Sequence, residues 1–261
     1  MRHRPISALL ITACLLSLEP RSFGASPSSS TAEPAQVVLV ELFTSEGCSS
    51  CPPADDILRQ INGKRTSAGQ LIVGISEHVT YWNDDGWKDP YSSPIYTERQ
   101  DAYGNRFGLS SVYTPQMVVD GERQFVGNDS RALIQALIAE EHQEQIDLRI
   151  LSSVPSEGFL TVRFSVKQVQ PRHALEIMAV LTDDADSSSV LRGENKGHTL
   201  QHVSVARAMT KVATINTDSE ETVRIPVPSS ITSAHGVGHH LILFAQGKNL
   251  GSVVGVDTVP F

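Results

Sequence analysis

The stretch VVLVELFTSEGCSSCPP, residues 37–53, decides the fold that this sequence predicts. Its first seven residues, Val37–Phe43, are almost all apolar, which is typical of a strand buried on both faces. Cys48 and Cys51 follow with C-x-x-C spacing, and two prolines then open a helix, where missing N–H groups cost little. A strand, a C-x-x-C pair and a helix in this order are typical of redox-active thiols.

The two cysteines have the chemistry of a redox pair. Unsatisfied N–H groups at a helix start carry partial positive charge and stabilise a thiolate. We expect Cys48 to be exposed at the helix tip and to act as the nucleophile, while Cys51, one turn on, resolves the mixed disulfide and forms a Cys48–Cys51 disulfide. The alternative is an inert disulfide, but closing so short a loop constrains the unfolded chain little.

Glu41 interrupts the apolar strand seven residues before Cys48. A carboxyl buried there would have a raised pKa and would carry protons to and from Cys51, as a third catalytic residue. The alternative is that Glu41 points to solvent. Glu46, beside the pair, is expected to be an exposed loop residue.

Downstream of the pair, the pattern predicts the rest of an α/β domain. The expected elements are a helix from Pro53 to Ile61, a strand at Leu71–Ile75 parallel to the first, a helix at 94–107, a hairpin at 117–126 and a helix at 128–145. After Ile146, period-two alternation predicts about seven strands and no helix. We therefore expect an α/β domain over 36–145 and an all-β, sandwich-type domain over 146–261.

The first residues are typical of an export signal. Arg2 and Arg4 precede a short apolar run, and a cut near Ala25 would leave a Ser- and Pro-rich leader over 26–35. Export predicts a periplasmic or secreted protein of bacterial type. Cys14 also resembles a lipoprotein acceptor, and only its lipidation would anchor the chain to a membrane.

The long loop from His78 to Pro94 holds both tryptophans. Trp82 and Trp87 would either form a substrate-binding wall beside the thiols or pack the loop onto the sheet. Thr114 and Pro115 precede the hairpin strand, and a cis bond there would present the Thr114 backbone to an extended partner chain.

Other classes of function are tested against charge and motifs. A formal net charge of −8 argues against nucleic-acid binding. No phosphate-binding loop or hydrolase elbow is present, and thiol exchange needs no organic cofactor. His78 with Cys48 and Cys51 would make an incomplete site for zinc or copper, so a metal-binding or metal-delivery protein is one alternative. A non-catalytic binding module is another.

The segment Val40–Asp55 resembles the secreted bacterial thioredoxin-like family catalogued as domain of unknown function 1223. Further matches are His78…Tyr81-Trp82…Gly86–Pro90, Arg99-Gln100…Tyr103, Val112–Gly121 and Arg192–Asn195…Gly197…Leu200…His202. The resemblance implies a thioredoxin-like fold with a cis-proline loop at Thr114-Pro115 facing the cysteines. The resulting hypothesis is an exported thiol–disulfide oxidoreductase that acts on protein or small thiol partners.

Overall fold

The apolar run that opens the decisive stretch is strand β1 (Val37–Thr44), and the next apolar run is β2 (Leu71–His78). The two strands pair in parallel, from Val37 opposite Leu71 to Thr44 opposite His78. Helix α1 (Pro52–Ile61) lies between them and begins at the two prolines, as predicted. The local β–α–β prediction around the cysteines is therefore confirmed.

The computed structural model describes residues 36–167, 174–231 and 237–261. The predicted signal (1–25), the predicted leader (26–35) and Cys14 lie outside the described residues. None of the helices described is long and apolar enough to cross a membrane.

The other predicted elements of the first half are also present. They are helix α2 (Pro94–Arg106), the hairpin of β3 (Gln116–Val119) and β4 (Arg123–Val126), and helix α3 (Ser130–Ala139). Helix α3 is shorter than the predicted range of 128–145, and the side chain of Asp129 caps its start.

Seven strands follow in the described residues after 146, as the period-two alternation predicted. They are β5 (Asp147–Ser156), β6 (Phe159–Lys167), β7 (Leu175–Ser189), β8 (Thr199–Ile215), β9 (Ser219–Pro226), β10 (His239–Gly247) and β11 (Val253–Pro260).

The expected fold class, a thioredoxin-like α/β domain followed by a β-sandwich-type domain, is wrong. Strands from both halves of the chain form one mixed eight-stranded sheet in the order β11-β10-β7-β8-β2-β1-β3-β4. The two halves join where β8 runs parallel to β2, with Ser76 opposite Val205. Hydrophobic periodicity predicts that a strand exists but not which strand lies beside it, so the sequence did not reveal this junction.

The elements that pack against the large sheet differ from one end of it to the other. Helices α1 and α3 contribute to a core with the β1 residues Val38, Val40 and Leu42, while α2 lies on the opposite face. A three-stranded sheet, β5-β6-β9, shares a core with β7 and β10. Residues at alternate positions on a strand point to opposite faces, so central strands such as β1 and β2 contribute to two cores.

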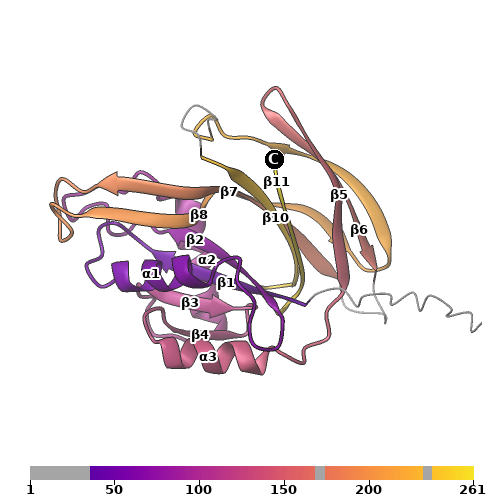
Figure 1. Cartoon of the computed structure of the whole chain (residues 1–261), viewed down its shortest axis with the longest axis horizontal. Helices are drawn as coiled ribbons and strands as arrows, with labels where there is room; N and C mark the ends of the chain where they lie inside the picture. The colour runs from indigo at the N-terminus through magenta and orange to yellow at the C-terminus, as the bar shows by residue number, and fades with distance from the viewer. Residues whose placement is uncertain (1–35, 168–173, 232–236) are drawn as a thin grey trace, which may run out of the picture. The chain divides into compact units, whose positions relative to one another are not determined.

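The long β7–β8 hairpin positions the candidate site. Its pairing runs from Leu175 opposite Ile215 to Ser189 opposite Thr199. Figure 1 shows the end of this hairpin reaching past the start of α1. Its connecting segment, Val190–His198, is called the 190–198 loop below. The hairpin brings this loop to the turn that carries the cysteines.

Candidate functional site

The two cysteines form the predicted disulfide in the turn that leads into α1. Cys48 and Cys51 are bonded with their Cα atoms 5.4 Å apart. Cys51 is the N-cap residue of α1, and its carbonyl accepts from the backbone N–H of Ala54 at 2.8 Å. The sulfur of Cys48 lies 3.3 Å from the hydroxyl oxygen of Ser50. A reduced Cys48 would thus have a hydrogen-bond donor and a helix N-terminus to stabilise its thiolate.

The expectation that Cys48 is exposed at the helix tip is wrong. Both cysteines are 0 % exposed, and within the motif only Ser49 and Ser50 reach solvent. The expectation assumed that no other segment lies against the helix tip. Here the 190–198 loop, far along the chain, is bonded to the cysteine turn beside that tip.

The 190–198 loop is bonded to the backbone of the cysteine turn. The side-chain amide of Asn195 donates to the carbonyls of Glu46 and Cys48, at 2.9 and 3.0 Å. The backbone N–H of Ser49 donates to the carboxylate of Glu194 at 3.0 Å. A reagent that attacks the disulfide therefore requires this loop to move or the sulfurs to become exposed in another way.

The 190–198 loop also meets the tryptophan loop, residues 79–93. A Cβ atom added to Gly193 would lie 3.2 Å from the Asp85 carbonyl and 3.3 Å from Cβ of Trp87. Gly193 has a φ of +74°, which a glycine adopts without strain. The two loops thus approach each other closely beside the cysteine turn.

Glu46 is fully buried, contrary to the expectation of an exposed loop residue. Its carboxylate accepts from the indole N–H of Trp87 at 2.8 Å and from the hydroxyl of Ser188. It also lies 3.3 Å from Nε2 of His202. Trp87 therefore contacts the cysteine turn through a buried carboxylate.

His202 and Asp55 complete a buried row of charges, and neither was among the predicted site residues. Nδ1 of His202, on β8, lies 3.7 Å from Oδ1 of Asp55, on α1. Burial lowers the pKa of His202, but Asp55 and Glu46 outweigh this effect and raise it to about 10. His202 is therefore a cation between two acids at neutral pH. The only sequence signal for it was its place in the quoted Arg192…His202 motif.

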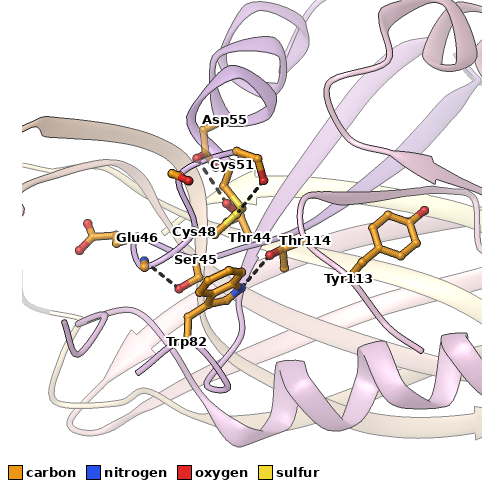
Figure 2. Close-up of a disulfide and its surroundings, with 12 residues drawn as sticks. Thr44, Ser45, Glu46, Cys48, Cys51, Asp55, Trp82, Tyr113 and Thr114 are labelled. Atoms are coloured by element: carbon orange, nitrogen blue, oxygen red, sulfur yellow. Dashed lines mark hydrogen bonds between the residues drawn. A yellow bond between two sulfur atoms is a disulfide. The ribbon is translucent and has the colours of Figure 1, made fainter. Parts of the chain in front are cut away.

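Of the residues predicted to bind substrate, Trp82 is hydrogen-bonded to Thr114, whereas Trp87 is bonded to Glu46. Figure 2 shows Trp82 and Thr114 beside the disulfide. The indole N–H of Trp82 donates to the Thr114 hydroxyl at 2.8 Å, and the Thr114–Pro115 bond is cis. A Cβ on Gly127 would lie 3.1 Å from both Pro115 and Ala54, so this proline lies close to the first turn of α1.

Glu41 is buried, but the structure does not bring it to the cysteines. Leu42 faces α1, so Glu41 faces α2, where its carboxylate accepts from Arg99 at 2.5 Å and from Tyr103 at 2.7 Å. Burial and the neighbouring Glu41 raise the pKa of Glu77 well above its ordinary value. Arg99 thus compensates a buried acidic pair that is separate from the disulfide.

His78 is paired with Asp89 rather than with the cysteines. Its Nδ1 lies 2.7 Å from Oδ2 of Asp89, and its ring meets the ring of His202 edge-on at 4.6 Å. Burial raises the pKa of Asp89, but His78 and backbone N–H donors outweigh it and lower it to about 2. Over residues 36–167, 174–231 and 237–261, no group of three or more His, Cys, Asp or Glu side chains is arranged to hold a metal ion.

A crystal structure of an Agrobacterium tumefaciens protein is similar to this chain at 26% identity and a TM-score of 0.65, over 87% of this chain and 96% of that one. Two other solved structures are too distant to carry an argument. MtrC from Shewanella baltica has 13% identity and a TM-score of 0.26 over 45% of this chain and 22% of that one. A Kluyveromyces marxianus β-glucosidase has 12% identity and a TM-score of 0.26 over 77% of this chain and 19% of that one. No curated protein matches the chain. The model of a family described as a protein of unknown function, DUF1223, matches residues 39–246. The chain therefore belongs to the DUF1223 family.

Proposed function

We propose that this protein is a thiol–disulfide oxidoreductase that uses Cys48 and Cys51 on protein or small-molecule partners. The observation that carries the proposal is a disulfide in the turn that leads into helix α1, next to the buried row of Asp55, His202 and Glu46. A loop of this length adds little to stability, so stability alone gives little reason for the bond. The proposed place of action is outside the cytoplasm, where such a bond persists.

The proposed chemistry is two successive exchanges. In the reduced protein, the Cys48 thiolate attacks a partner disulfide, forms a mixed disulfide and releases one partner thiolate. Cys51 then attacks Cys48, restores the Cys48–Cys51 bond and releases the second partner thiolate. Two electrons pass from the protein to the partner. The reverse sequence oxidises a partner dithiol.

Partner access is proposed to depend on the 190–198 loop. Asn195 and Glu194 hold this loop by three hydrogen bonds to the turn that carries the cysteines. Contacts of this number cost a few kcal/mol to break, so a populated open state is accessible. Once the loop opens, Thr114 and Trp82, both half-buried, are the proposed contacts for a partner backbone.

The second candidate function is a binding module with a passive disulfide, and the complete burial of both cysteines favours it. The reduction potential separates the two candidates. Structural disulfides have potentials below about −300 mV, whereas catalytic pairs lie at about −120 to −270 mV.

The proposed function is tested by reduction of insulin with a thiol donor present. The wild type is expected to accelerate the reaction, Cys48→Ser to abolish the acceleration, and Cys51→Ala to accumulate a mixed disulfide detectable by mass. Asp56→Asn, on the exposed side of α1, is the folded control. Equal rates for wild type and Cys48→Ser would discard the proposal.

A further inference from the structure

Two buried polar atoms beside the disulfide have no hydrogen-bond partner in the described part of the chain. They are Oδ1 of Asp55 and Nδ1 of His202, and they face each other at 3.7 Å. Asp55 is 5% exposed and His202 is 2% exposed. An unpartnered buried carboxylate oxygen costs free energy, so its presence calls for an explanation.

Asp55 lies one helical turn after Cys51. Its backbone N–H donates to the Cys51 carbonyl at 3.1 Å, and residues four apart on a helix share a face. The hydroxyl of Thr44 donates to Oδ2 of Asp55 at 3.3 Å and holds that oxygen (Figure 2). Oδ1 faces His202, makes no hydrogen bond in the described part of the chain, and is the carboxylate oxygen that no hydroxyl holds.

His202 fixes the charge state of this neighbourhood. Glu46 lies 3.3 Å from its Nε2 and Asp55 lies 3.7 Å from its Nδ1, so the ring carries its proton and charge at neutral pH. The imidazolium thus lies within 4 Å of a carboxylate oxygen of each acid. The other titratable groups around the ring are His78, Tyr91 and Asp186.

We propose that Asp55 accepts the Cys51 thiol proton when Cys51 resolves the mixed disulfide, and that His202, which faces Oδ1 of Asp55, is the positioning residue for this carboxylate. This inference rests on the proposed function and assigns the proton transfer to Asp55 in place of Glu41. Glu41 is on the other face of β1, bonded to Arg99 and Tyr103.

The proton and electron balance is complete with glutathione disulfide as the partner. The Cys48 thiolate attacks it, and one glutathione thiolate leaves. Cys51 then attacks Cys48 while its proton passes to Asp55, the Cys48–Cys51 bond forms, and the second glutathione leaves as a thiolate. Asp55 gives up the proton to solvent or to that thiolate. Two electrons have passed from the protein dithiol to glutathione disulfide.

The test follows the two steps separately in the reduced full-length protein mixed with glutathione disulfide. Acid quenching and mass measurement give the formation and the decay of the glutathionylated protein. Asp55→Asn is expected to slow the decay on the order of a hundredfold at pH 7 and to leave the formation rate unchanged. Its decay rate should then rise about tenfold per pH unit, as the thiolate fraction of Cys51 grows.

Two variants serve as controls. Asp56→Asn removes the neighbouring exposed acid of the same helix and is expected to decay at the wild-type rate. Asp55→Glu keeps a carboxylate and is expected to recover much of the lost rate. An Asp55→Asn protein that folds and decays at the wild-type rate, with the wild-type pH profile, overturns the inference.

His202→Gln gives a second test that leaves the carboxylate in place, in case Asp55→Asn does not fold. Loss of a neighbouring cation raises the pKa of a carboxyl by about 1–3 units. The pH at which the decay rate of the glutathionylated protein falls on acidification is therefore expected to rise by that amount. A decay rate that falls at the same pH in His202→Gln as in the wild type contradicts the inference. If the wild type itself never forms the glutathionylated species, the proposed function fails instead.

Discussion

Two buried glutamates in the first segment differ in what surrounds them. Glu41 faces α2, where Arg99 compensates its charge, whereas Glu46 faces His202 and Trp87 beside the disulfide. The apolar strand around Glu41 already raised the possibility of burial. Two partners of Glu46, Ser188 and His202, lie 142 and 156 residues away, and no local pattern predicts contacts over such separations.

At this scale we predict a dependence of stability on pH that comes from His202. Its pKa rises from 6.5 in the unfolded chain to about 10 in the fold, so the stabilisation is complete below pH 6.5 and is lost as pH rises toward 10. Between pH 6.5 and 9 the wild type should lose roughly 3 kcal/mol more than His202→Gln. Urea unfolding of both proteins across this range measures the difference. If the free energies of unfolding of the two proteins change with pH in parallel, the His202 ring is not charged.

At the scale of elements, the 190–198 loop is bonded to the turn that carries the disulfide, and partner access is proposed to depend on it. The sequence predicted the helices and strands well because each has its own periodicity and its own start or stop residues. It did not predict that the 190–198 loop lies against the cysteine turn, because the bonded residues Asn195 and Glu46 are 149 residues apart in the chain. The Arg192…His202 motif was noted only as a resemblance, since nothing in its composition shows what it touches.

We predict that Asn195→Ala speeds the reduction of the disulfide. The substitution removes two hydrogen bonds from the loop, each contributing about 1 kcal/mol, so the open state should be about thirtyfold more populated. The rate of reduction by dithiothreitol, followed by the thiols released, measures the effect. Lys196→Ala, an exposed neighbour on the same loop, is the control and should react at the wild-type rate. If Asn195→Ala reacts no faster than Lys196→Ala, the 190–198 loop does not limit access to the disulfide.

At the scale of the whole molecule, the pairing of β8 with β2 joins the two halves into one sheet. Leu39, Val73 and Ile75 from the first half share a core with Val180 and Phe244 from the second. The sequence suggested a change of pattern at residue 146, and the change from mixed elements to strands is real. Separate domains did not follow from it, because a strand-rich segment can extend an existing sheet as readily as it can build its own.

We predict that residues 36–145 do not fold cooperatively alone. The fragment would expose the β2 edge and the apolar face that Val180, Ile242 and Phe244 cover in the full chain. Circular dichroism during urea unfolding should show a gradual change for the fragment and a sharp transition for residues 36–261. A sharp transition in the fragment would mean that the first half is an independent domain.

The most direct test of the central claim is the reduction potential of the Cys48–Cys51 couple, measured by equilibration with glutathione buffers of known poise. A redox-active pair beneath the 190–198 loop predicts a value above about −270 mV. A value below about −300 mV would mean that the bond is structural, and would contradict the account.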